Sequence, residues 1–155
     1  MMGSLHQANS YEHLESGHTT EDNEERNKQV EKRNRKTSTY LASDVKLPQI
    51  FGNKEAELTL ISWGSMKGPI LQAMKESGNK FNYLHFSYLW PLPENDLKKI
   101  LLTLKKTLLI ENNSTGQLGM LLKMVTGMEI KDRLLKYDGR PIYPEEILDK
   151  IKQFI

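Results

Sequence analysis

The chain has 155 residues, of which 37% are hydrophobic, and its 22 basic and 20 acidic residues leave a net charge of +2. It contains no cysteine, which excludes a disulfide, a cysteine-ligated zinc, an iron–sulfur cluster held by this chain and a thiol nucleophile. The charge balance argues against a nucleic-acid-binding protein. No apolar run approaches the roughly 18 residues that span a bilayer, so we expect one cytoplasmic domain that does not bind membrane.

The N-terminal part of the chain is polar and predicts a linker helix. Val30 is the only sizeable apolar side chain of residues 15–39. The run from Glu21 to Lys36 is acidic first and basic later, which suits the helix dipole, and Thr19 or Thr20 is placed to cap the helix. A helix with one apolar residue cannot bury a face of its own. It is therefore either a solvated linker or a helix that lies against a partner.

The rest of the chain alternates between strand and helix patterns. We therefore divide it into a polar segment over residues 1–44 and a domain over residues 45–155. The domain is predicted to be α/β, with a parallel sheet covered by helices on both faces. The expected strands are Leu58–Trp63, Phe81–Leu89, Thr107–Glu111 and Asp132–Tyr137. The expected helices begin near Pro69, Glu94, Gln117 and Pro144.

The loops that follow the strands carry the candidate interface residues, because such loops bear the binding groups of parallel sheets. Trp90 stands beside two prolines that fix its loop, and it is either an interface anchor or a lid over its own core. Glu111 ends a buried strand, so its carboxylate must reach the loop region or find a partner, and the plainer interpretation is that it is a cap partner for the following turn. The turn Thr115, Gly116 and Gln117 opens a helix. These five residues are our interface candidates.

Two residues that suggest catalysis have plainer interpretations. Ser65 follows a strand and precedes a helix, as in a nucleophile elbow, but Lys67 stands where that motif needs its second glycine. Capping of the helix by Ser65 or Gly68 is the favoured interpretation. His85 lies in the middle of a strand, where a packed, hydrogen-bonded histidine is the usual case.

Four stretches of the chain, in the same order and spacing, resemble the α subunit of 2-oxoacid:ferredoxin oxidoreductases. The resemblance extends to Ser10–Gly17 and to parts of the polar run, so it covers nearly the whole chain from Ser10. The four stretches are Leu58–Ile70, Asn82–Pro93, Glu111–Leu118 and Ile130–Pro141.

The resemblance implies that this chain corresponds to the C-terminal domain of a much longer subunit. It implies a three-layer αβα fold like the C-terminal domain of transketolase, with a mostly parallel five-stranded sheet. One strand is antiparallel, and Leu47–Phe51 is expected to supply it. A polar helix precedes the domain.

The family oxidises 2-oxoacids with thiamine diphosphate, Mg²⁺, an iron–sulfur cluster and coenzyme A, and passes electrons to ferredoxin. The partners implied are the β subunit and the remaining α-subunit domains. The family's Tyr-Pro-Ile-Thr-Pro loop is not reproduced by Pro141–Pro144, and the Gly-Asp-Gly motif belongs to the β subunit. We therefore expect no catalytic, cofactor-binding or metal-binding residue in this chain.

Two hypotheses follow. In the first, the chain acts in subunit assembly and is inactive as an isolated protein. In the second, it is a stand-alone α/β module that binds a phosphate-bearing small molecule at the helix N-termini at Ser65–Gly68 and Thr115–Gln117.

Overall fold

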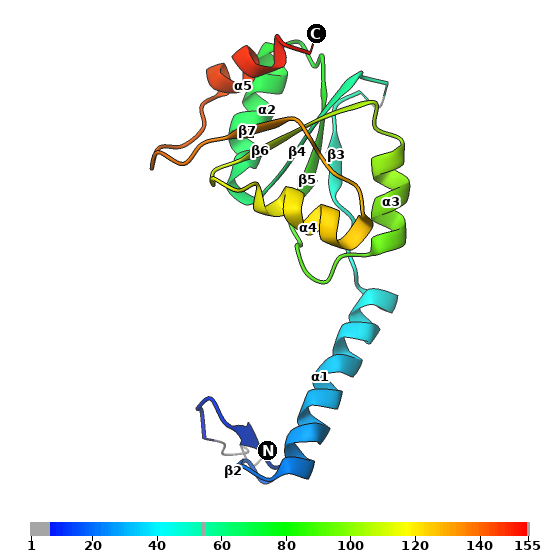
Figure 1. The fold of residues 1–155 in the computed structure, drawn as a ribbon, viewed down its shortest axis with the longest axis vertical. Helices are drawn as coiled ribbons and strands as arrows, with labels where there is room; N and C mark the ends of the chain where they lie inside the picture. The colour runs from blue at the N-terminus through cyan, green and yellow to red at the C-terminus, as the bar shows by residue number, and fades with distance from the viewer. Residues whose placement is uncertain (1–6, 54, 155) are drawn as a thin grey trace, which may run out of the picture. The chain divides into compact units, whose positions relative to one another are not determined.

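The computed structural model describes residues 7–53 and 55–154 of the chain. The chain divides into two compact units, with the boundary between Val45 and Lys46 (Figure 1). Within the described residues, none of the helices combines the length and the apolar composition that a membrane crossing requires.

The first unit contains a long polar helix, α1 (Asn23–Ser43), that has no buried residue. Asp22 caps this helix by accepting hydrogen bonds from the backbone N–H groups of Glu24 and Glu25, each at 3.0 Å. The expected threonine cap is wrong, because Thr19 and Thr20 belong to a strand. Aspartate is a stronger cap than threonine and stands one residue before the helix.

A short antiparallel hairpin accompanies α1 in the first unit. It pairs β1 (Glu12–His13) with β2 (Thr19–Thr20). Arg33 of the helix donates two hydrogen bonds to the carboxylate of Glu12, at 2.9 and 2.7 Å, and Gln29 donates to the backbone oxygen of His13. Polar contacts thus join the hairpin to the helix, in keeping with the scarcity of apolar side chains.

The second unit is built on a five-stranded sheet with the strand order β3-β5-β4-β6-β7 (Figure 1). Strands β4, β5, β6 and β7 are parallel, and β3 is the antiparallel edge strand, which confirms the expected sheet. Their bounds are β3 (Gln49–Phe51), β4 (Leu58–Trp63), β5 (Asn82–Phe86), β6 (Lys106–Glu111) and β7 (Arg133–Leu135).

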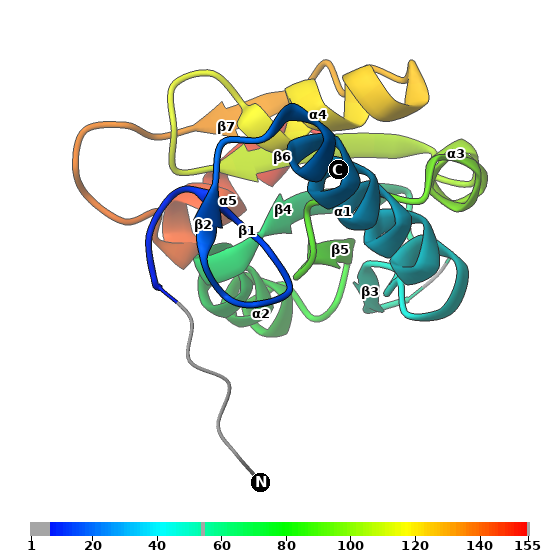
Figure 2. The ribbon, with the colours of Figure 1, turned by 90° about the horizontal axis from the view of Figure 1, so that it is seen from below.

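Helices cover both faces of this sheet, which confirms the three-layer αβα fold (Figure 2). One face packs against α2 (Lys67–Glu76) and α5 (Pro144–Ile151). The other face packs against α3 (Glu94–Leu102) and α4 (Gln117–Thr126). A short 3-10 helix, η1 (Gly64–Met66), leads into α2 without a side-chain cap, so the expected capping by Ser65 or Gly68 is wrong.

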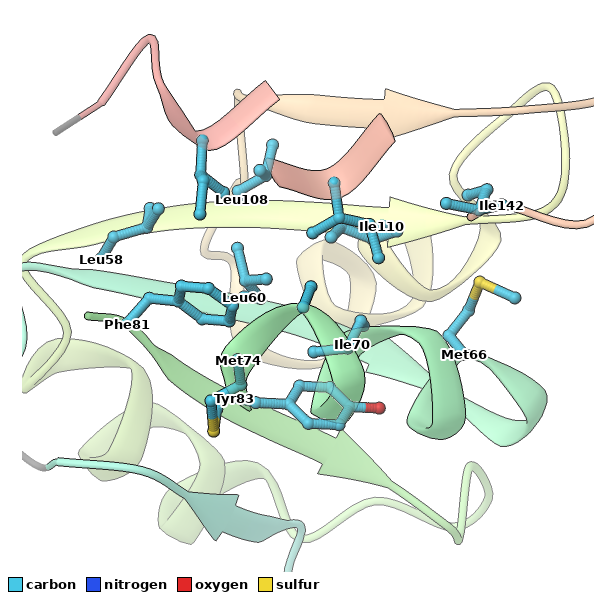
Figure 3. Close-up of a cluster of buried hydrophobic side chains, with 13 residues drawn as sticks. Leu58, Leu60, Met66, Ile70, Met74, Phe81, Tyr83, Leu108, Ile110 and Ile142 are labelled. Carbon is cyan, nitrogen blue, oxygen red and sulfur yellow. The ribbon is translucent and has the colours of Figure 1, made fainter. Parts of the chain in front are cut away.

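Successive residues of each central strand point into opposite cores. Leu60 of β4 and Tyr83 of β5 belong to the core beneath α2 and α5, whereas Ile61 and Leu84 belong to the core beneath α3 and α4. Figure 3 shows the first core, where Leu60, Tyr83 and Ile70 of α2 lie close together. Burial on both faces is the reason that these strands are continuous apolar runs.

Candidate functional site

The carboxyl ends of the parallel strands meet at one edge of the sheet, and the loops after them carry the candidate residues. This edge contains η1, the loop 87–93 and the loop 112–116. The chain leaves β4 toward β5 on one side, and β6 lies on the other side. The space between the loops after β4 and β6 is therefore the switch point at which open α/β sheets bind ligands.

Glu111, the last residue of β6, is 0% exposed and lies beneath the start of α4. Its carboxylate accepts hydrogen bonds from the backbone N–H groups of Leu118, at 3.0 Å, and Gly119, at 3.3 Å. It also accepts from the indole of Trp63, at 3.1 Å, and from the side-chain amide of Asn113, at 2.7 Å. The positive end of the helix dipole stabilises the negative charge there. The carboxylate therefore does not reach the surface and contributes to any interface only by holding the loop.

Asn113 completes the cap of α4. Its side-chain oxygen accepts hydrogen bonds from the backbone N–H groups of Thr115, Gly116 and Gln117, of which the one to Gly116 is shortest, at 2.7 Å. With Glu111, it occupies every backbone N–H group from residue 115 to residue 119. A phosphate at this helix would have to displace a buried carboxylate. The structure therefore does not favour the phosphate-binding hypothesis at Thr115–Gln117.

The turn itself requires glycine at position 116. Gly116 is buried and has a φ of 71°, in the left-handed region that disfavours other residues. A Cβ at this position would stand 3.2 Å from Leu109 and 3.5 Å from Arg133. Gly116 thus shapes the turn, and the exposed members of this candidate group are Thr115 and Gln117.

Trp90 is 69% exposed, at the carboxyl edge beyond β5. The peptide bond to Pro91 is cis, and Pro93 directly precedes α3. The neighbouring Leu89 packs against the core beneath α3 and α4, which ties the loop to the domain. The indole is therefore presented to solvent on an anchored loop and does not form a lid over its own core.

Two hollows at the same edge were not predicted from the sequence. One, of about 170 Å³, lies between Trp63 and Asn113, and another, of about 570 Å³, is lined by Met66, Asn112 and Tyr137. Tyr137 is 71% exposed and lies after β7. The sequence signal for this loop was only the turn 138–141. Tyr137 lines the larger hollow only because the loop after β7 lies across from η1, and the sequence does not reveal that contact.

A buried polar chain links the two central strands on the α2 side of the sheet. Ser62 and Tyr83 hydroxyls are 2.9 Å apart, and the Tyr83 hydroxyl lies 2.7 Å from Nδ1 of His85. Burial raises the pKa of Tyr83 to about 12, and burial, followed by the charge of Lys67, lowers the pKa of His85. His85 is thus a packed, hydrogen-bonded residue, as its place in a strand indicated.

The described residues contain no group of three or more histidine, aspartate or glutamate side chains that could hold a metal ion. The start of α4 also lacks the character of a diphosphate cradle, because its backbone N–H groups already donate to Glu111, whereas η1 and α2 begin without a side-chain cap. The edge presents two exposed aromatic side chains, Trp90 and Tyr137.

Comparison with known proteins shows matches along most of the chain. Residues 56–147 match the family described as pyruvate:ferredoxin oxidoreductase core domain II. The α subunit of the 2-oxoacid:ferredoxin oxidoreductase of Saccharolobus solfataricus is 35% identical over an alignment of 152 residues that covers 93% of this chain and 24% of that subunit. The α subunit of 2-oxoacid:ferredoxin oxidoreductase 2 from Aeropyrum pernix is 31% identical, over 93% of this chain and 23% of its own length.

A solved structure shares the fold. It is the 2-oxoglutarate:ferredoxin oxidoreductase from Magnetococcus marinus with 2-oxoglutarate, coenzyme A and succinyl-CoA bound. The TM-score is 0.71 at 27% identity, over 96% of this chain and 26% of that chain. The chain therefore spans about a quarter of the length of the relatives that it matches.

Proposed function

The chain belongs to the family of pyruvate:ferredoxin oxidoreductase core domain II, and on this premise we propose that it is the C-terminal domain, or a split piece, of the α subunit of a 2-oxoacid:ferredoxin oxidoreductase. Its role is assembly. It supports the cofactor-binding domains and the β subunit in a cytoplasmic complex that passes electrons to ferredoxin. Residues 45–155 form the family domain, and residues 1–44 are the segment that connects it to the rest of the subunit.

The observation that carries this proposal is the extent of the match. It includes nearly all of this chain but about a quarter of each relative, so the remaining three quarters of such a subunit lie outside the matched region. Thiamine diphosphate, Mg²⁺, the iron–sulfur cluster and coenzyme A are assigned to those other parts of the complex. The occupied start of α4 supports this assignment, and no step of the reaction is given to this chain.

The exposed residues of the carboxyl edge are the proposed contact surface. Trp90, after β5, and Tyr137, after β7, present large aromatic groups there, and the exposed polar residues Thr115 and Gln117 follow β6, which lies between these strands. Aromatic side chains on anchored loops contribute much of the binding energy of protein interfaces. Glu111 and Gly116 support this surface from within.

The test is an affinity pull-down of the tagged chain from a lysate of its source organism, with bound proteins identified by mass spectrometry. We expect a thiamine-binding β subunit or the rest of an α subunit. Trp90→Ala should reduce recovery of these proteins. Leu102→Ala is the matched control, because Leu102 is 74% exposed but ends α3 at the opposite edge of the sheet.

Two results would overturn the proposal. One is recovery of neither subunit, with the chain running as a lone monomer. The other is decarboxylation of a 2-oxoacid by the purified chain supplied with thiamine diphosphate and Mg²⁺, since that would place the chemistry within this domain.

A further inference from the structure

A pocket of about 330 Å³ lies at the amino edge of the sheet, opposite the proposed contact surface. Its floor is set by strand register, since Thr59 of β4 is paired with Asn82 of β5, and Ile50 of β3 is paired with Leu84. The residues that follow α3, Thr103 to Lys105, line it as well. The volume lies within the range of sites that bind small molecules.

One wall of this pocket contains a polar group that the fold leaves unsatisfied. Asn82 is 3% exposed, and its side-chain oxygen is the buried side-chain atom without a hydrogen-bond partner among the described residues. On its sheltered side this oxygen lies against Gly52, where a Cβ would come within 3.2 Å of it. Asn82 also lines the pocket, so a molecule bound there is in a position to supply the missing partner.

An unpaired buried oxygen weakens the fold, because no hydrogen bond replaces the hydration that it loses. Such violations in an otherwise consistent structure are expected at functional sites. The χ2 torsion of asparagine is soft, so the amide can turn to meet a donor that enters the pocket.

The other side chains define the chemistry of the ligand. Ile50 and Leu84 offer apolar contacts, and the hydroxyl of Thr103 already donates to the backbone oxygen of Ile100 and can only accept further bonds. Lys105 is paired with Glu57 at 2.6 Å, so the described residues that line the pocket offer no spare charge to attract an anion.

We propose that this pocket binds a small neutral molecule that has an apolar body and an N–H or O–H donor directed at Asn82. A primary amide or an alcohol fits this description. The site is independent of the proposed assembly role, because it lies at the other edge of the sheet and shares no residue with the contact surface.

The experiment is an NMR titration of the ¹⁵N-labelled chain with benzamide, which has an apolar ring and an amide donor. N,N-dimethylbenzamide is the control, because it has nearly the same body and no donor. We expect saturable shifts at the backbone amides of Thr59, Leu84 and Thr103, with a dissociation constant on the order of 1 mM. The dimethyl compound should bind at least about fivefold more weakly.

The Asn82→Leu variant should bind both compounds with equal affinity. If this variant does not fold, the comparison of the two compounds on the natural chain still decides the matter. Equal affinity of the natural chain for both compounds would overturn the proposal. So would the absence of saturable shifts up to about 10 mM benzamide, or shifts confined to the hollow between α2 and α5 at Ser77 and Leu148.

Discussion

Replacing Glu111 with alanine removes the acceptor of four donors within the carboxyl edge of the sheet. Two of them, the backbone N–H groups of Leu118 and Gly119, belong to buried residues of α4. A buried donor without a partner costs about 1–3 kcal/mol. Two such donors predict a loss of about 4 kcal/mol in the free energy of unfolding, since the other donors, on Trp63 and Asn113, are half-exposed and can turn to water.

Urea unfolding followed by tryptophan fluorescence measures this loss directly. A Trp90→Phe background leaves Trp63, whose indole bonds to Glu111, as the reporter. With an m-value of about 1.3 kcal/mol/M, the midpoint of Glu111→Ala should fall by about 3 M.

The matched control is Glu129→Ala, because Glu129 is an exposed carboxylate paired with Lys123. Its unfolding midpoint should stay at that of the parent chain. A midpoint shift of less than about 0.5 M for Glu111→Ala would refute the reasoning, because the cap of α4 would then contribute little to stability.

Two further changes test the packing and the polar chain. Gly119→Ala should lower the free energy of unfolding by about 1–3 kcal/mol, because the new Cβ would stand 2.6 Å from Leu109. Gly68→Ala is the control and should not lower it, because a Cβ at Gly68 would meet open space. Calorimetry of both variants measures the difference. His85 has a pKa lowered from 6.5 by burial and then by Lys67, so protonation favours the unfolded chain. The contribution of His85 to the free energy of unfolding should be complete above pH 6.5 and should fall as the pH drops from there through the lowered pKa. The difference in melting temperature between the parent and His85→Gln should therefore shrink over the same range. A constant difference across that range would contradict the assignment.

The parallel sheet could be predicted because continuous apolar runs such as Leu58–Trp63 indicate strands buried on both faces. The antiparallel strand Gln49–Phe51 was expected only from the family resemblance, since three partly exposed residues carry no pattern of their own. The hairpin of β1 and β2 was missed, because strands of two residues joined by polar contacts leave no hydrophobic signal.

The candidate site could be predicted where its geometry is local. The prolines around Trp90 indicated an anchored aromatic residue but left open whether it was an interface anchor or a lid over its own core, and the structure exposes it to solvent. The partners of Glu111 include an indole 48 residues away in the chain, and no spacing rule reveals such a contact. The unpaired oxygen of Asn82 likewise depends on how β3 is aligned with β5, which the sequence pattern does not specify.

The dependence of α4 on Glu111 has a consequence for the order of folding events. The first turn of this helix is completed by a strand residue seven positions earlier, and that residue is in place only once β6 has paired with β4. Strand pairing between distant segments is slower than local helix formation. The start of α4 therefore forms late, after β6 has joined the sheet. The same segment cut out as a peptide would fray at that end.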